Sequence, residues 1–266
     1  MADTFPSPEL WDRVWRRSGA GTALHHPLLS AVSSVMALDG ACALEVGCGS
    51  AADSIELAHR GARVSALDFS WQALKRAWAG MADRQAHLSL VNGDTFCLPY
   101  PDAAFDLVFS QGLLEHFADP VPPVREQIRV LRPGGYLCVD VPQTLSPVTL
   151  RKRWHVWRGT WFAGWETSFT LGQLERLLRE QGLGVVTSYG HIYPELGNAL
   201  RNLHTLDERR ALPVWFGPAA KRRVEGLWRW LESRRWYYRF MACIGVVARK
   251  GDAQLAAIGP LPQESL

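Results

Sequence analysis

The sequence contains no uninterrupted apolar run of about 18 residues, so no helix that crosses a membrane is expected. The apolar stretch LLSAVSSVMAL at residues 28–38 begins late in the chain and lacks the basic leader of a secretory signal peptide. We therefore expect this stretch to form one face of a buried helix.

The chain also lacks any pair of cysteines spaced as in a zinc site or a redox motif. Its five cysteines are isolated, and four of them lie in apolar runs typical of strands. Three histidines of the C-terminal half, His155, His191 and His204, show no ligand spacing either. We expect reduced thiols, a cytoplasmic protein and no metal site.

The net charge is only +3, but the charge is unevenly distributed. Residues 151–240 carry 16 lysines and arginines against 8 acidic residues, and eight of the twelve tryptophans. The remainder of the chain is net acidic. The low total charge and the lack of a recognisable RNA-binding module argue against nucleic acid as a partner.

Apolar runs alternate with helical patterns through the first 141 residues, which predicts a parallel sheet covered by helices on both faces. Ser70 is placed to cap one helix, and Thr170 with Gln173 has the spacing of a capping box at the start of another. Residues 151–169 have no clean period, so no element is predicted there. The expected strands are 41–46, 62–68, 86–94, 105–112, 136–142, 183–193 and 239–250.

A glycine-containing loop joins the first expected strand to the following helix. Gly47-Cys48-Gly49-Ser50-Ala51-Ala52 brings the backbone close to a ligand, and Asp68 follows about twenty residues later. The loop alone fits either a dinucleotide or S-adenosylmethionine. None of the four lysines (Lys75, Lys152, Lys221, Lys250) lies four residues after a tyrosine, so the Tyr-x-x-x-Lys relay of a dehydrogenase is absent.

The sequence blocks around this loop are more specific than the loop itself. Glu45 completes E-x-G-x-G, NGD follows at residues 92–94, LPYPDAAFDLVFSQGLLEHFADP at 98–120 and LRPGGYLCV at 131–139. In this order and spacing the blocks resemble class I S-adenosylmethionine-dependent methyltransferases, nearest to the ubiquinone and menaquinone biosynthesis branch. The resemblance covers residues 40–141 and the closing strand, and it implies a seven-stranded Rossmann-like sheet whose last strand is antiparallel.

The resemblance also implies which residues hold the cofactor. Asp68 would accept from the ribose hydroxyls, which suits a carboxylate with two acceptor oxygens. One position departs from the family pattern, because Ala51 stands where the third loop glycine is usual. The cofactor residues implied are Glu45, Gly47, Cys48, Gly49, Asp68, Phe69, Asp94, Thr95, Phe96, Gln111 and Gly112.

His116 follows the fourth expected strand, beside the position where the family places the methyl group. A histidine there can take a proton from an attacking hydroxyl or amine. It can also position the substrate or serve a structural role, and the sequence leaves both alternatives open.

The basic, tryptophan-rich segment is interpreted as a lid over the acceptor. The expected organisation is a helical cap at residues 1–39, a methyltransferase domain at 40–250 with lid insertions near 143–170 and 194–237, and a tail at 251–266. A helix at 220–236 with an apolar face among arginines could instead rest on an anionic membrane surface. The predicted acceptor contacts are Trp11, Trp15, Trp165, Tyr193 and Arg201.

The sequence thus predicts transfer of a methyl group from S-adenosylmethionine to a small molecule that is acidic, aromatic or lipid-like. Two alternatives stay open at this point: an NAD-type oxidoreductase, and a membrane-docked or partner-dependent module that binds the cofactor without turnover.

Overall fold

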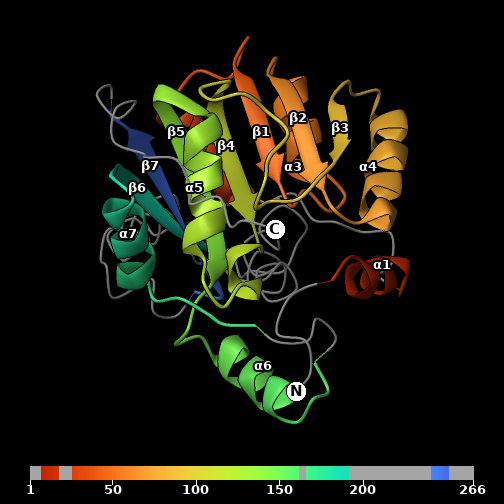
Figure 1. The fold of residues 1–266 in the computed structure, drawn as a ribbon, viewed down its shortest axis with the longest axis vertical. Helices are drawn as coiled ribbons and strands as arrows, with labels where there is room; N and C mark the ends of the chain where they lie inside the picture. The colour runs from red at the N-terminus through yellow and green to blue at the C-terminus, as the bar shows by residue number, and fades with distance from the viewer. Residues whose placement is uncertain (1–6, 18–25, 162–165, 192–240, 252–266) are drawn as a thin grey trace, which may run out of the picture.

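The computed structural model describes residues 7–17, 26–161, 166–191 and 241–251. They form a seven-stranded sheet in the order β3-β2-β1-β4-β5-β7-β6, with helices on both faces (Figure 1). Five strands run parallel, and β6 continues the sheet through β7, which is antiparallel to both β5 and β6. The predicted doubly wound α/β sheet with a reversed last strand is confirmed.

The strands are β1 (Cys42–Val46), β2 (Arg63–Asp68), β3 (Ser89–Asn92), β4 (Phe105–Gln111), β5 (Leu131–Pro142), β6 (Leu183–His191) and β7 (Cys243–Lys250). The helices are α1 (Pro8–Arg17), α2 (His26–Ser33), α3 (Ala52–His59), α4 (Trp71–Arg84), α5 (Val121–Val130), α6 (Pro147–Trp157) and α7 (Leu171–Glu180), with a short 3₁₀ turn η1 (Leu114–His116).

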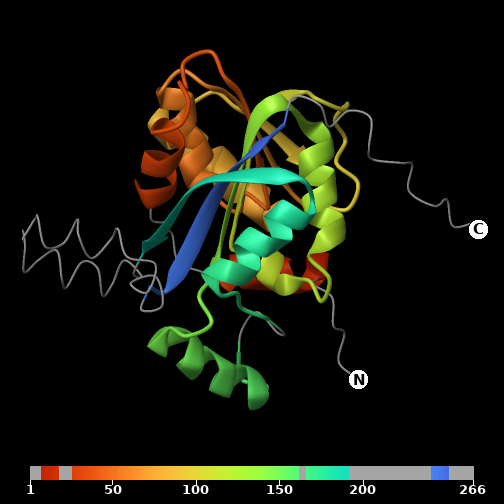
Figure 2. The ribbon, with the colours of Figure 1, turned by 90° about the vertical axis from the view of Figure 1, so that its left-hand side faces the viewer.

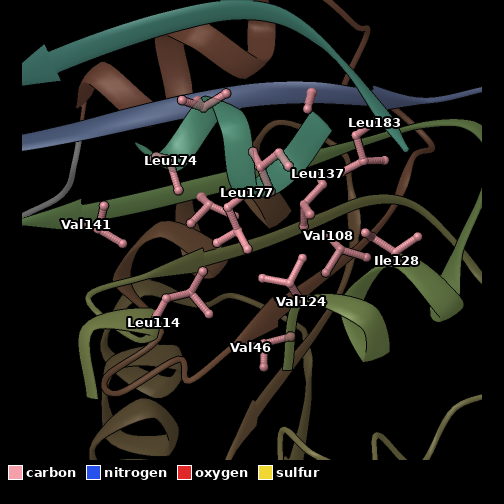
Figure 3. Packing of buried hydrophobic residues seen from close by; sticks show 14 of the residues in the cluster. Val46, Val108, Leu114, Val124, Ile128, Leu137, Val141, Leu174, Leu177 and Leu183 are labelled. Carbon is pink, nitrogen blue, oxygen red and sulfur yellow. The ribbon is translucent and has the colours of Figure 1, made fainter. Parts of the chain in front are cut away.

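Apolar side chains from alternate strand positions build a core on each face of the sheet. On one face, Val124 and Ile128 of α5 and Leu174 of α7 pack on Leu137 and Val141 of β5 (Figure 3). On the other face, helices α2 and α3 pack against the intervening strand positions (Figure 2). These two layers hold the strand ends, and the loops that follow them, in fixed register.

Both predicted helix caps are present. The Ser70 hydroxyl accepts from the Ala73 N–H at the start of α4. Thr170 and Gln173 form a reciprocal capping box at the start of α7. Local sequence therefore sets where these two helices begin.

The structure departs from the sequence prediction at three elements. Helix α6 lies in a stretch where no element was predicted, because two of its buried residues, Thr149 and Lys152, are polar and break the apolar period. Strand β5 begins at Leu131, before the Arg-Pro-Gly-Gly turn expected to precede it. Within the described part of the expected cap, α2 packs in the core and α1 packs against α4.

Among the described residues, no helix combines the length and the apolar character that a membrane crossing requires.

Candidate functional site

The glycine loop begins directly after β1 and turns into α3. Gly47 and Gly49 adopt left-handed backbone conformations, with φ of 72° and 53°. Ala51 is also left-handed, with φ of 55°, at the position where the family pattern has glycine. The N–H groups of Gly47 and Cys48 both donate to the carbonyl of Leu67, which ties the loop to the end of β2.

Asp68, the last residue of β2, lies against this loop. Its carboxylate accepts from the Gly49 N–H at 2.9 Å and from the Ser70 N–H at 2.8 Å. Burial raises the pKa of Asp68 to about 6, although the backbone donors act in the opposite direction. A carboxylate offers about four acceptor sites in all, so Asp68 keeps capacity for a ligand donor.

A cavity of about 490 Å³ opens at the carboxyl ends of β1, β2, β3 and β4. This is where ligands bind in open α/β sheets, and the volume is that of a small-molecule site. Its wall combines carboxylates, aromatic rings and glycine backbone. The predicted residues that line it are Gly47, Asp68, Phe69, Asp94, Thr95, Phe96, Gln111, Gly112, His116, Trp11 and Trp15.

Three predicted cofactor residues do not line this cavity. Glu45 is buried behind the loop and accepts from the Ser54 hydroxyl at 2.5 Å, so it joins β1 to α3. Burial, and then the nearby Asp53 carboxylate, raise the pKa of Glu45 well above its usual range. Burial likewise raises the pKa of the Cys48 thiol, which makes it a poor nucleophile. Gly49 is covered by Trp15.

The cavity wall fits an adenosyl ligand with an amino-acid end. Thr95 Oγ1 and Gln111 Nε2 are buried and have no hydrogen-bond partner among the described residues, and both side chains belong to the cavity wall. Phe69 and Phe96 offer ring faces for a flat base, and Asp68 offers acceptor sites for vicinal hydroxyls. The donor and acceptor set therefore matches what such a ligand presents.

Helix α1 forms one side of the cavity. The Asp12 carboxylate accepts from the Ser70 hydroxyl at 2.6 Å and from the Gln72 N–H at 3.2 Å, which fixes α1 to the start of α4. The ring of Trp11 meets the His116 ring edge to face, with centroids 4.8 Å apart. Both predicted tryptophans, Trp11 and Trp15, line the cavity, and their contact with an acceptor stays a prediction.

His116 lies between α1 and a group of charged residues that the sequence analysis did not identify. Glu166 Oε1 is 4.0 Å from His116 Nδ1, and its other carboxylate oxygen pairs with the Lys152 ammonium of α6. Trp161 Nε1–H donates to Glu166 Oε1 at 2.8 Å. Burial raises the pKa of Glu115, the neighbour of His116, to about 8. No local spacing signals this group, because its members come from separate segments.

A second polar group lies at the carboxyl end of β5. His191 Nε2 is 3.1 Å from an Asp140 carboxylate oxygen, and Cys243 of β7 lies beside them, with the three ligating atoms within 4.8 Å of one another. These are residue types that bind zinc, brought together by three neighbouring strands. The His191–Asp140 distance is also that of a direct hydrogen bond.

The remaining acceptor predictions lie outside the described residues. They are Trp165, Tyr193 and Arg201, together with the insertion at 194–237.

Comparison with known proteins agrees with this geometry. Residues 44–139 match the family model described as a methyltransferase domain. The chain is 35% identical over 128 residues to the demethylmenaquinone methyltransferase of Deinococcus radiodurans, covering 47% of this chain and 48% of that protein. It is 35% identical over 99 residues to the 27-O-demethylrifamycin SV methyltransferase of Amycolatopsis mediterranei, covering 36% of each. The chain thus spans about half the length, or less, of these curated relatives.

Solved structures share the fold over a larger part of the chain. An S-adenosylmethionine-dependent methyltransferase from Mesorhizobium loti superposes with a TM-score of 0.57 at 18% identity, covering 84% of this chain and 96% of that one. Residues 44–139 therefore match a methyltransferase domain, and the chain shares the fold of solved S-adenosylmethionine-dependent methyltransferases. The resemblance expected from the sequence is confirmed.

Proposed function

We propose that the protein transfers a methyl group from S-adenosylmethionine to a small-molecule acceptor. The observation that carries this proposal is the convergence of Asp68, Asp94, Gln111 and the glycine loop, from four successive parallel strands, on one cavity. The sheet also differs from an all-parallel dinucleotide-binding sheet, because β7 is inserted antiparallel between β5 and β6.

Each wall residue has a distinct part in holding the cofactor. Asp68 accepts from its ribose hydroxyls, Phe69 and Phe96 pack on its base, and Thr95 and Gln111 complete its polar contacts. When bound, S-adenosylmethionine supplies a methyl group on a carbon already joined to a good leaving group. The chain must then align the acceptor, and alignment contributes about 7–11 kcal/mol of barrier lowering.

His116 is the residue we assign to the acceptor's proton. It belongs to the cavity wall and lies against Trp11. A positioned base contributes about 10²–10⁴-fold when the nucleophile must lose a proton. We therefore propose an acceptor with an ionisable O–H or N–H group.

The acceptor is proposed to be acidic, aromatic or lipid-like. Two tryptophans of α6, Trp154 and Trp157, are exposed, and the Arg158 guanidinium lies 4.7 Å from the Trp154 ring centre. Curated relatives are named for demethylmenaquinone and 27-O-demethylrifamycin SV, both small molecules.

We further propose a cytoplasmic location, because all five cysteines are free. Peripheral membrane contact stays a prediction for residues 220–236.

The test uses S-adenosylmethionine with a labelled methyl group and a panel of small aromatic and acidic acceptors. We expect label in a small-molecule product, and its loss in Asp68→Ala. Transfer of label to protein or nucleic acid alone would contradict the proposal. Deleting residues 195–236 should abolish acceptor methylation and leave cofactor binding intact if that segment forms the lid.

A further inference from the structure

Helix α6 turns polar side chains inward and apolar side chains outward. Thr149 and Lys152 are the buried side chains among its described residues. Leu150, Trp154 and Trp157 are exposed, and their spacing of four and then three residues places them in one stripe along the helix. An amphipathic helix of a folded domain normally directs such a stripe at the core. The apolar stripe of α6 is instead directed at solvent.

Arginines border this apolar stripe on both sides. Because successive residues of a helix are about 100° apart, Arg153 falls on one side of the stripe and Arg151 on the other, and both are exposed. Arg158 follows the helix, with its guanidinium 4.7 Å from the centre of the Trp154 ring. The sequence has no acidic residue from 141 to 165. The outer face of α6 therefore combines apolar surface with positive charge.

Helix α6 lies beside the edge of the sheet at which the cavity opens. It follows β5 at the carboxyl end of that strand, and in both views it lies apart from the helices that cover the sheet (Figures 1 and 2). Its inner face is joined to the site, because Lys152 pairs with Glu166, and Glu166 Oε1 is 4.0 Å from His116 Nδ1 in the cavity wall. A partner bound to the outer face of α6 thus lies close to the cavity.

The charge of this face selects among possible partners. A second copy of the chain would bring the same arginines against themselves, which is unfavourable in a symmetric contact. Residues 192–240, which lie outside the described part of the chain, carry ten lysines and arginines against five acidic residues, so their net charge has the wrong sign. An anionic lipid bilayer offers both an apolar layer and negative phosphates. Tryptophan is enriched in its headgroup region, and arginine pairs with phosphate.

We propose that the outer face of α6 docks the protein on an anionic lipid bilayer. The apolar stripe enters the headgroup region, and the three flanking arginines bind lipid phosphates. Docking brings the edge of the cavity to the bilayer surface, where an amphiphilic acceptor dissolved in the lipid can reach it. This consequence for the acceptor rests on the proposed function, whereas the docking itself is independent of the reaction.

The test measures binding of the full chain to lipid vesicles by flotation, without cofactor or acceptor. One set of vesicles contains phosphatidylcholine alone, and the other contains equal parts of phosphatidylcholine and phosphatidylglycerol. We expect binding to the anionic vesicles and at least about tenfold weaker binding to phosphatidylcholine alone, because each arginine near an anionic surface contributes about fivefold.

A single tryptophan tests the apolar stripe. Trp157→Ala should weaken binding to the anionic vesicles about tenfold, because the indole no longer enters the headgroup region. Trp78→Ala is the matched control, since Trp78 of α4 is 68% exposed and Trp157 is 81% exposed. It should leave vesicle binding unchanged. Both side chains are exposed, so neither variant should lower Tm, and thermal unfolding checks this.

The arginines are tested together. Replacing Arg151, Arg153 and Arg158 with glutamine should weaken binding to the anionic vesicles about a hundredfold and remove the preference for them, at about fivefold for each arginine. The control replaces three other exposed arginines with glutamine and removes the same charge from the opposite edge of the sheet. It should keep the preference for anionic vesicles. The control arginines are Arg60, Arg63 and Arg84.

Two results of the flotation measurement overturn the proposal: no binding to either set of vesicles, and equal binding of Trp157→Ala and Trp78→Ala. Sedimentation velocity supplies a third. A wild-type dimer that becomes monomeric in Trp157→Ala, without vesicle binding, would show that a second copy covers α6. If vesicle binding fails while a water-soluble acceptor is methylated, the docking proposal alone is wrong. Vesicle binding without any methyl transfer would contradict the proposed function and leave the docking in place.

Discussion

The indole of Trp15 lies directly on Gly49. A Cβ atom added to Gly49 would fall 2.5 Å from Cζ2 of Trp15, far inside the contact distance of two carbon atoms. Helix α1 therefore packs on the glycine loop, and the absence of a side chain at position 49 is what allows it to do so. Gly49, which is predicted to contact the cofactor, thus also provides the surface on which α1 packs.

We predict that Gly49→Ala displaces α1. The added methyl group should cost about 1–3 kcal/mol in steric conflict, on top of about 1–2 kcal/mol for an alanine in the left-handed region. Thermal unfolding measures the loss of stability, and tryptophan fluorescence measures the displacement of α1. Gly40→Ala is the control, because Gly40 has φ of 73° but no atom within 4 Å of an added Cβ. An equal loss of stability in both variants would show that Trp15 does not constrain position 49.

Cofactor affinity should depend on pH through Asp68. Ribose hydroxyls donate to the ionised carboxylate, so binding favours the ionised form. The full affinity is therefore expected above pH 6, near the raised pKa of Asp68, and is lost as the pH falls through that value. The loss should approach about tenfold per pH unit below pH 6. Calorimetric titrations from pH 5 to pH 8 check this, and Asp68→Asn should bind weakly at every pH. A flat profile for the wild type would remove Asp68 from the cofactor site.

His116→Gln should lower turnover by about 10²–10⁴-fold while cofactor affinity stays the same. The loss should shrink at high pH, where the acceptor ionises without help. Steady-state rates of the wild type and of His116→Gln, measured with one acceptor between pH 6 and pH 10, test this prediction. If turnover is unchanged with an oxygen nucleophile, only a structural role for His116 remains.

The capping box of α7 yields a prediction about stability alone. Thr170→Ala removes the acceptor for the Gln173 N–H and should lower the free energy of unfolding by about 1 kcal/mol. Thr170→Ser keeps the hydroxyl and should change it little. Denaturant unfolding of both variants measures the difference, and equal stabilities would mean that the cap contributes nothing.

The sheet could be predicted from the sequence because its strands are continuous apolar runs separated by helical patterns. Once the strands are parallel, Asp68, Asn92 and Gln111 must meet at one edge, and they do. Ser70 and Thr170 marked helix starts by local chemistry that depends on few neighbours. Apolar runs and capping residues are local sequence patterns, so they can be recognised in a single sequence.

The remainder depends on contacts that no local pattern encodes. Lys152 and Glu166 lie 14 residues apart, and their pairing depends on how α6 packs against the segment that carries Glu166. The family motif predicts that Glu45 contacts the cofactor, whereas the pleat of β1 directs it behind the loop toward Ser54. Helix α6 was missed because the residues it buries include a lysine, whose partner lies outside the helix.

Calorimetric titration with S-adenosylmethionine, its demethylated product and NAD tests the central claim most directly. We predict saturable binding of the first two and none of NAD. Asp68→Ala should weaken binding by about 1–3 kcal/mol, because the ribose hydroxyls lose their acceptor. Tight binding of NAD together with no binding of S-adenosylmethionine would contradict the assignment of this cavity.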